Sequence, residues 1–412
     1  MTPPPVSLII VSRGRPAALA RCVTAVMQLW YRPLEVIVVA DRDGIARVSD
    51  LPTGASVKQV RFEEANIARA RNAGIAAASG QIIAFIDDDA VPEPSWLNHL
   101  VAPFSDPAVA IVGGFVKGRN GISWQWQGRS VDAWGHTHEI TTKGSEPLRV
   151  AQEPGHALKT EGTNMAVRAG ALRNCGGFDP AFQYFLDETD LNLRLASFGL
   201  VAAIAPQAVV HHGFAENETR QPNRAPRDLF QIGASWAVFL AKHCPKDQIG
   251  ARWHDIRQTE RKRLIAYMRD GRVDLWDVSG ILKTLENGYA EGSRRTIVQQ
   301  APPLRGPNVD FQPLAAPVSM ASERLEGRPW NRGTLTDRAR AKVAAGKVAT
   351  VMVFSPTTLF HRVRFSDFGI WEQTGGLFGK SLRTDPIWRF WRFGDRVRRE
   401  WALAAPRHQM KN

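Results

Sequence analysis

The chain has 412 residues, of which 44% are hydrophobic, so it is long enough for two or three domains and apolar enough to form packed cores rather than a disordered chain. It has no run of about 18 apolar residues, which argues against a membrane-spanning helix, and its first residues lack the pattern of a secretory signal. Its three cysteines show no metal-ligand spacing, which is typical of a protein in a reducing compartment. We therefore expect a cytoplasmic protein.

The net charge of +13 is carried by the second part of the chain. Residues 1–250 contain 24 basic and 24 acidic residues, whereas residues 251–412 contain 29 basic and 16 acidic residues. A neutral part followed by a basic part indicates a catalytic or binding body joined to a surface that faces an anionic partner. A basic surface that only maintains solubility is the simpler alternative.

Short β-branched runs alternate with helical patterns near the N-terminus. We predict strands at residues 6–12, 34–40 and 81–86, a helix at residues 17–29, and an Ala-rich helix that ends at Gly80. Strands that alternate with helices form a parallel sheet with crossover connections. The fold class is therefore α/β.

Polar residues follow each of these strands. Ser12 and Arg13 end the first strand, Asp41 follows the second, and three aspartates at residues 87–89 follow the third. The carboxyl ends of neighbouring parallel strands share one edge, where the ligands of open α/β sheets bind. Adjacent carboxylates raise one another's pKa unless a cation lies among them. The sequence thus predicts a ligand site with a cation at this edge.

The remainder of the chain has weaker patterns. Residues 110–116 predict a strand, residues 117–160 predict long loops or a flap, and residues 200–212 predict two short strands. Three helical patterns and then one clear strand, "KVATVMVF", follow. We predict four parts: an α/β domain at 1–225, a helical extension at 226–300 with helices at 228–242, 248–269 and 274–291, a Pro/Gly-rich connection at 301–333, and a basic, Trp-rich C-terminal module at 334–412.

Six segments within residues 5–215 or so resemble, in order, the motifs of the inverting family 2 glycosyltransferases. They are "SLIIVSRGRP", "VVADRDG", "ARARNAGIAAASGQIIAFIDDDAVPEPSWL", "EGTNMAVRAGALRNCGGFDPAF", "FLDETDLNLRLASFG" and "VVHHG". The resemblance implies the GT-A fold, with a mainly parallel mixed sheet, and a nucleotide-diphospho-sugar as donor. It does not extend to the rest of the chain.

The resemblance also implies a divalent metal, Mg²⁺ or Mn²⁺, on the donor diphosphate. Such a metal neutralises the negative charge that grows on the leaving diphosphate. Asp87 and Asp89 stand in the D-x-D positions, with Asp89 as direct ligand, Asp87 and Asp88 near ribose or metal-bound water, and His212 as a further ligand. His211 is expected to pack or to support His212. The alternative is a solvated acidic turn that caps a helix.

Further residues are expected around the donor on the same grounds. They are Ser12, Arg13, Asp41, Arg71, Asn72, Gly162, Thr163 and Asn164. Asp41 could accept a hydrogen bond from a base edge or could only begin the turn "DRDG". Arg71 could lie beside the phosphates or could be an exposed helix residue paired with Glu63 or Glu64. Three tryptophans, Trp124, Trp126 and Trp134, could stack on sugar rings or could pack in the core.

Inverting transfer needs a base that takes the proton from the acceptor hydroxyl. In the family this base lies in an E-D pair that opens a helix, and here the pair is swapped, as Asp187-Glu188. The aligned base is Glu188, and which of the two acids acts stays open. An acidic helix N-terminus, favoured by the helix dipole, is the alternative.

The C-terminal segment at residues 385–408 mixes five aromatic residues with arginines. This composition suits a segment on the inner face of an anionic membrane, and a helix that packs its tryptophans on the protein itself is the alternative. No recognised nucleic-acid module is present.

We expect an enzyme that transfers a sugar to a saccharide or lipid-linked acceptor in the synthesis of surface polysaccharide or glycolipid. A non-catalytic nucleotide-sugar or carbohydrate-binding protein with the same fold is the alternative. A nucleotidyltransferase is disfavoured, because "SRGRP" has a single glycine where a glycine-rich phosphate loop would be needed.

Overall fold

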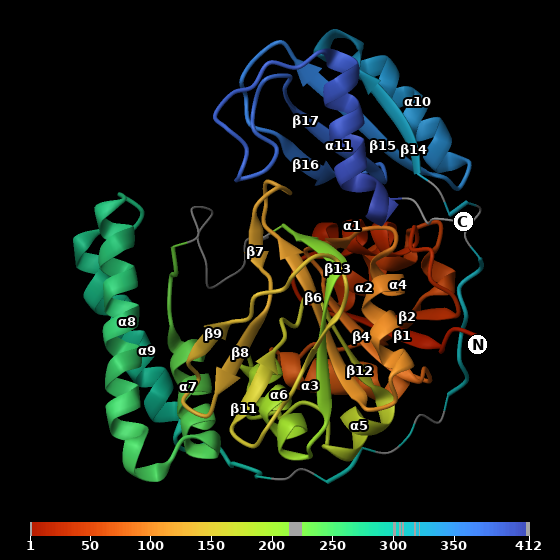
Figure 1. Ribbon diagram of the computed structural model, residues 1–412. Helices are drawn as coiled ribbons and strands as arrows, with labels where there is room; N and C mark the ends of the chain where they lie inside the picture. Colours follow the sequence, from red (N-terminus) through yellow and green to blue (C-terminus); the bar gives the residue numbers. More distant parts are fainter. Residues whose placement is uncertain are drawn as a thin grey trace.

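The computed structural model describes residues 2–213, 225–299, 302–304, 306, 309–316, 319–320 and 322–408. The chain forms an α/β domain, a helical extension at its side and a smaller C-terminal module that sits on the α/β domain (Figure 1).

The α/β domain is built on one large mixed sheet. Its main path runs β10-β13-β6-β12-β4-β1-β2-β3. β12 is antiparallel to both of its neighbours, whereas the pairs β1/β2, β1/β4, β2/β3 and β6/β13 are parallel. The bounds are β1 Val6–Ser12, β2 Leu34–Ala40, β3 Lys58–Arg61, β4 Ile82–Asp87, β6 Val109–Lys117, β10 Leu148–Val150, β12 Met165–Arg168 and β13 Val201–His212, with β5 Ala90–Pro92 paired to β13 and β7 Trp124–Trp126 paired to β6.

Helices cover both faces of this sheet. Successive residues of β1 point to opposite faces, so Leu8 joins one core and Ile9 the other. The first core is closed by α1 Pro16–Val26, α2 Arg42–Ser49 and α4 Trp96–Val101, and the second by α3 Ile67–Ala77, α5 Ala169–Asn174 and α6 Asp187–Ser197. The predicted α/β fold with a mainly parallel mixed sheet is confirmed.

Two local predictions were wrong. Residues 200–212 form the single strand β13 rather than two strands, with an irregularity in its register between Ala205 and Val209. Residues 117–160, expected as loops, contain a small sheet in the order β11-β8-β9, formed by β8 Arg129–Asp132, β9 Thr137–Glu139 and β11 His156–Lys159.

The helical extension consists of α7 Phe230–His243, α8 Ile249–Arg269 and α9 Leu275–Gly292. α7 and α9 pack with their backbones in close approach, because a Cβ atom at Gly288 would lie 1.9 Å from the carbonyl oxygen of Phe230. α7 is fixed to α6 through Asp190, which is fully buried. Asp190 lies 2.8 Å from Lys242 Nζ and 2.9 Å from His243 Nε2.

The C-terminal module has a four-stranded sheet in the order β14-β15-β17-β16. Its elements are β14 Ser322–Gly327, α10 Arg332–Ala344, β15 Val348–Ser355, β16 Arg362–Phe365, β17 Ile370–Gly376 and α11 Phe393–His408. β14 lies within the segment that we expected to be a connection, so the module begins at Ser322 rather than at residue 334. Before it, the chain runs along the α/β domain, where the Leu314 N–H donates to the carbonyl of Leu34 at 2.7 Å.

The module is held against the α/β domain by buried charges. Glu93, which is 2% exposed, is paired with Arg407 of α11 and lies 3.5 Å from Lys117 Nζ and 2.8 Å from His211 Nε2. At the other end of the interface, the Val363 N–H donates to the carbonyl of Asn120 at 2.9 Å. The module therefore lies over the edge of the sheet where β4, β6 and β13 end.

None of the helices in the described part of the chain combines the length and hydropathy needed to cross a membrane.

Candidate active site

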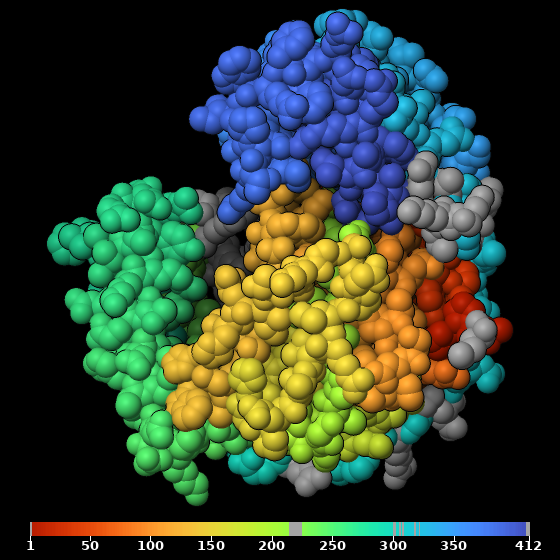
Figure 2. All heavy atoms as spheres, viewed as in Figure 1, coloured from red at the N-terminus to blue at the C-terminus, as the bar shows by residue number. Residues whose placement is uncertain are grey.

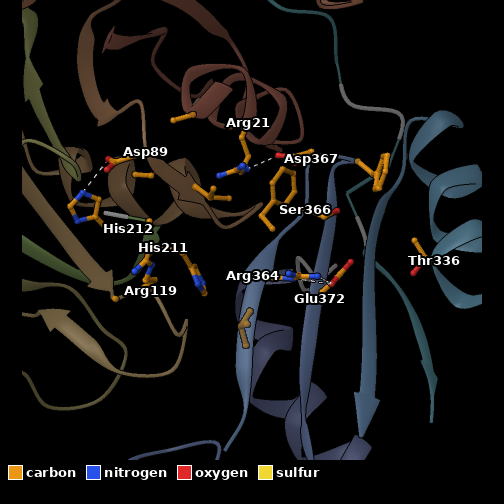
Figure 3. Close-up of a pocket in the computed structure, with 18 of the residues that line it drawn as sticks. Arg21, Asp89, Arg119, His211, His212, Thr336, Arg364, Ser366, Asp367 and Glu372 are labelled. Carbon is orange, nitrogen blue, oxygen red and sulfur yellow. Dashed lines mark hydrogen bonds and ion pairs between the residues drawn. The ribbon is translucent and has the colours of Figure 1, made fainter. Parts of the chain in front are cut away.

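Asp87, Asp89 and His212 form a compact group at the carboxyl edge of the sheet. Asp87 ends β4 and His212 ends β13. One ligand atom from each residue lies within 4.8 Å of the other two, and His212 Nε2 lies 3.1 Å from Asp89 Oδ1 (Figure 3). Carboxylate oxygens suit Mg²⁺ and Mn²⁺, and imidazole suits transition metals. The structure thus brings the three predicted metal residues together.

The charges in this group are suited to a cation. Burial raises the pKa of Asp87, against the opposing effect of Arg71 and His212. Burial lowers the pKa of His212, but its hydrogen bond and charge interaction with Asp89 outweigh this, so the pKa is raised overall. A bound divalent cation would favour the ionised carboxylates and the neutral imidazole. This donor set therefore fits a divalent metal.

Arg15 is the protein's own cation among the three aspartates, and sequence reasoning missed it. It lies 2.5 Å from Asp88 Oδ1 and 3.3 Å from Asp89 Oδ2. Ser12 donates a hydrogen bond of 2.6 Å to Asp88 Oδ2. Asp88 is fully buried, and burial raises its pKa to about 7. The expected contact of Asp88 with ribose does not fit this placement, because both of its oxygens face Ser12 and Arg15.

Arg71 joins the two acidic motifs. It is 4% exposed, forms an ion pair with Asp187, and lies 3.6 Å from Asp87 Oδ1. The alternative of an exposed arginine paired with Glu63 or Glu64 is wrong. Gly162 makes this position of Arg71 possible, because a Cβ atom there would lie 2.2 Å from Arg71 Nη2.

Glu188 lies at the start of α6, directly after two residues with left-handed backbone. Phe185 and Leu186 have φ values of 70° and 66°, a conformation that costs about 1–2 kcal/mol for each non-glycine residue. Such strain persists only where the surroundings hold it, and it concentrates at functional sites. Here the turn delivers the acid pair to the site.

The two acids of this pair have different surroundings. Asp187 is buried and bound to Arg71, whereas Glu188 is half-buried. Burial, followed by the charge of Asp187, raises the pKa of Glu188 to about 7, and Lys159 opposes this shift. A carboxylate that titrates near neutral pH is suited to general base catalysis.

A cavity of about 700 Å³ lies at the ends of β1 and β2. Ser12, Arg13 and Asp41 line it from the sheet, and Tyr184 lines it from the loop before α6. Asp41 also caps α2, since its Oδ1 accepts from Gly44 N at 2.9 Å. Asp41 therefore begins the turn, as one of the two alternatives expected, and also lines the cavity. The volume is in the range of small-molecule sites.

Thr163 follows Gly162 in the same loop. Its hydroxyl is buried and has no hydrogen-bond partner among the described residues. A buried hydroxyl without a partner costs free energy unless a ligand or water supplies one. Thr163 therefore has an unused hydrogen-bonding group in this loop.

Asn72 and Asn164, two residues expected near the nucleotide-sugar, use their side chains to hold other parts of the protein. The amide of Asn72 forms two hydrogen bonds with the backbone of Phe178, at 2.7 and 2.9 Å. Asn164 is fully buried, and its amide bonds to the carbonyls of Phe115 and Ala208 and to the indole of Trp96. Both side-chain amides are therefore used in hydrogen bonds within the protein, and the role expected of Asn164 falls to its backbone.

The remaining aromatic and histidine residues divide in a similar way. Trp126 is buried in the core, and the Trp134 indole N–H donates to Gln248 at 2.8 Å. Trp124 is the one tryptophan of these three with an exposed side chain, at 39%. His211 packs on Trp371 with ring centroids 5.0 Å apart, which agrees with its expected packing role.

The α/β domain thus has acidic residues and a histidine clustered at the carboxyl edge of its sheet and a cavity of about 700 Å³ at the ends of β1 and β2, an arrangement that agrees with the one expected of a GT-A glycosyltransferase domain. Residues 7–176 match the family described as Glycosyl transferase family 2. Over these residues the chain resembles the family 2 glycosyltransferases.

Relatives of known function match the same part. The chain is 28% identical over 249 residues to a pre-mycofactocin glycosyltransferase of Mycobacterium tuberculosis, covering 58% of this chain and 48% of that protein. It is 26% identical over 265 residues to the O-antigen biosynthesis protein RfbC of Myxococcus xanthus, covering 59% of this chain and 20% of that protein. The chain therefore spans half or less of the length of these relatives.

Among solved structures, GalNAc-T7 with UDP, GalNAc and Mn²⁺ is similar with a TM-score of 0.44 and 17% identity, over 58% of this chain and 48% of that one.

Proposed function

We propose that the protein transfers a sugar from a nucleotide-diphospho-sugar to a hydroxyl acceptor with inversion, in the synthesis of a surface polysaccharide or glycolipid. The observation that carries this proposal is the convergence of Asp87, Asp89, His212 and Glu188 on one sheet edge beside the cavity. Relatives named for glycosyl transfer and for O-antigen biosynthesis support the class of product.

In this proposal, the cavity at the ends of β1 and β2 holds the nucleotide. Asp41 and Arg13 line its wall, and the unpartnered hydroxyl of Thr163 bonds to the donor. Asp87, Asp89 and His212 would hold Mg²⁺ or Mn²⁺, which when bound neutralises the leaving diphosphate. Arg71 adds a buried positive charge beside Asp87.

Glu188 is the proposed base. It takes the proton from the acceptor hydroxyl as the oxygen attacks the anomeric carbon from the side opposite the diphosphate. Asp187 is committed to Arg71, so it positions that arginine rather than receiving the proton.

Binding of UDP-, GDP- and dTDP-sugars to the full chain tests this function. We expect at least one donor to bind in the presence of Mg²⁺ or Mn²⁺, to lose binding when EDTA removes the metal, and to be slowly hydrolysed. The substitution Asp89→Asn should weaken metal-dependent donor binding at least tenfold, because it removes a charged ligand. Calorimetry and release of free sugar measure both effects.

Two outcomes would count against the proposal. If no donor binds with either metal, the nucleotide-sugar site is misassigned. If a donor binds but is neither hydrolysed nor used for transfer to any added acceptor, the alternative of a non-catalytic nucleotide-sugar-binding protein gains support.

We further propose that the enzyme contacts the inner face of an anionic membrane peripherally. α11 itself does not provide the contact surface, since Arg396, Val397 and Glu400 are buried in the module. The segment before it is different, because Ile387, Trp388 and Phe390 are all more than 60% exposed beside Arg389 and Arg392. Exposed aromatic residues among arginines are suited to anionic lipid.

We expect the triple substitution I387S/W388S/F390S to reduce binding to vesicles with anionic lipid at least tenfold in a sedimentation assay. The matched control is Trp330→Ser, which removes an equally exposed tryptophan, 74% exposed, from a different loop of the module. Equal loss in both variants, or no loss in the triple variant, would disprove this contact surface.

A further inference from the structure

A basic hollow of about 620 Å³ lies where the α/β domain meets the C-terminal module. The loop between β6 and β7 supplies Arg119, and β7 supplies Trp124. β16 supplies Arg362, and the segment after β17 supplies Arg383. Among the described residues, no acidic side chain lines this hollow. Three guanidinium groups therefore converge from two parts of the chain with no countercharge in the wall.

These arginines differ from the other arginines of the module. Arg332 and Arg364 share Glu372 at 3.0 and 2.7 Å, whereas within the described ranges no ion pair occupies Arg119, Arg362 or Arg383. Arg383 only donates to the hydroxyl of Ser123, at 3.3 Å. Guanidinium groups without a carboxylate partner are free to form paired hydrogen bonds with the oxygens of a phosphate.

Trp124 offers a flat apolar surface at the same place. It is 39% exposed, and Phe115 holds it edge to face, with ring centroids 5.3 Å apart. Lys117 Nζ lies 5.5 Å from the ring centroid. A fixed and partly exposed indole can pack against the apolar face of a sugar ring.

The hollow is connected to the metal group. Gln125 lines the hollow, and its Oε1 lies 3.1 Å from His212 Nδ1. Arg119 also lines a second cavity, of about 660 Å³, which contains Asp89 and His212 and lies between the two domains (Figure 3). This cavity and the proposed nucleotide cavity share no lining residue. The cavity that contains Asp89 and His212 is therefore distinct from the proposed nucleotide cavity.

We propose that the hollow binds a phosphate or diphosphate group carried by the acceptor, with Arg119, Arg362 and Arg383 on its oxygens and Trp124 against the adjoining sugar. This inference rests on the proposed glycosyl transfer. The C-terminal module, which lies outside the matched family segment, then completes the acceptor site. Figure 2 shows the module seated on the α/β domain across an open notch from the helical extension.

The charge of the hollow favours phosphate over a single carboxylate, because three positive groups match the higher charge of a phosphate or diphosphate. A lipid-linked phosphate and a soluble phosphate ester present the same group to these arginines. The exposed residues proposed to contact a membrane, Ile387, Trp388 and Phe390, follow Arg383 closely in the chain. A lipid phosphate could therefore reach the hollow as well as a soluble ester, and the experiment must test both.

Calorimetric titration of the full chain with inorganic phosphate, in EDTA, tests the site. We expect the double substitution R362Q/R383Q to weaken phosphate binding at least tenfold, and added salt to weaken binding to the unmodified protein, since the arginines are exposed. The matched control is Arg338→Gln, an exposed arginine of α10 outside the hollow. Arg119→Gln, on the other domain, should act in the same direction.

Equal phosphate affinity in the double variant and the unmodified protein would overturn the proposal, as would equally tight binding of acetate. Vesicles of phosphatidylcholine with and without phosphatidic acid separate the sources. Loss of binding to phosphatidic acid in the double variant supports a lipid phosphate, and loss of inorganic phosphate binding alone supports a soluble ester.

Donor binding by the same variants separates this inference from the proposed function. None of the three arginines lines the nucleotide cavity, so R362Q/R383Q should bind the donor as the unmodified protein does. Unchanged phosphate binding with intact donor binding and transfer would remove only the acceptor site. If the double variant loses phosphate binding but the unmodified protein binds no donor, the phosphate site stands and only the proposed function is removed.

Discussion

Replacing Glu188 by Gln is expected to reduce sugar transfer by about 10²–10⁴-fold, which is the range that general base catalysis contributes. The amide keeps the size of the side chain but cannot accept the acceptor proton. Donor binding should change little, because Asp87, Asp89 and the nucleotide cavity keep their geometry. Initial transfer rates and calorimetric donor affinities, measured on the same preparation, check both parts.

The pH dependence of the unmodified enzyme provides a second measure of the same role. Burial and the charge of Asp187 raise the pKa of Glu188 to about 7. A base must be ionised, so kcat/KM should rise with pH through the region near 7 and then level off. Glu188→Asp keeps the charge on a shorter side chain, and it should retain more activity than Glu188→Gln.

Two results would contradict this assignment. Transfer by Glu188→Gln at the unmodified rate would exclude Glu188 as base and leave Asp187 as the candidate. Loss of donor binding in Glu188→Gln would show that the side chain holds the donor instead.

The sequence predicted the location of this site better than the contacts within it. Periodicity and motif order placed the aspartates of β4, His212 and the acid pair of α6 on one edge, and the structure brings them together. Motif position alone could not show that the side-chain amides of Asn72 and Asn164 bond to the protein's own backbone. Their neighbours in space lie far away in sequence.

Arg15 was missed for a related reason. It stands two residues beyond Arg13 at the end of β1, and either arginine could have been the cation among the aspartates. The turn after Ser12 decides which one reaches Asp88 and Asp89, and the Gly14 N–H that donates to Asp41 at 2.6 Å is part of that turn. Such turn geometry has no periodic signal in the sequence.

The C-terminal module shows the limits of composition. An aromatic and arginine-rich segment predicts either a membrane surface or a packed helix, and in the structure one part of the segment is exposed and the other is packed. Trp388 is 65% exposed, whereas Trp401 packs with Phe393 against the buried Val397. β17, which the sequence did not predict, has buried polar residues such as Glu372 and Gln373, so its pattern is not hydrophobic.

Replacing Asp190 by Asn is expected to cause a larger loss of stability than a typical core substitution, about 3–5 kcal/mol, which is the range for breaking a buried ion pair. Asp190 is fully buried, and Arg194, Lys242 and His243 all lie within 2.9 Å of its oxygens. An amide cannot neutralise the buried Arg194, and Lys242 would keep only Asp179, whose Oδ2 lies 2.5 Å from its Nζ. Since Lys242 and His243 belong to α7, the helical extension should separate first.

The pH dependence of stability follows from the same contacts. Burial opposes ionisation of Asp190, but Arg194, His243 and Lys242 together hold the pKa of Asp190 well below its ordinary value. A carboxylate with a lowered pKa in the folded state stabilises the fold above the pKa of the unfolded state, and this contribution is lost as pH falls toward the folded value. The difference in unfolding free energy between the unmodified protein and Asp190→Asn should therefore be largest at neutral pH and decrease only below about pH 4.

Urea unfolding followed by tryptophan fluorescence and hydrogen exchange of α7 measures this effect. The matched control is Asp106→Asn, which removes the partner of Arg149 in an ion pair whose side chains are 36% and 61% exposed. Solvent screens that pair, so its loss should cost less than about 1 kcal/mol. Equal effects of the two substitutions would mean that water reaches the cluster around Asp190, and that α7 is held by its apolar contacts with α6 and α9 rather than by charge.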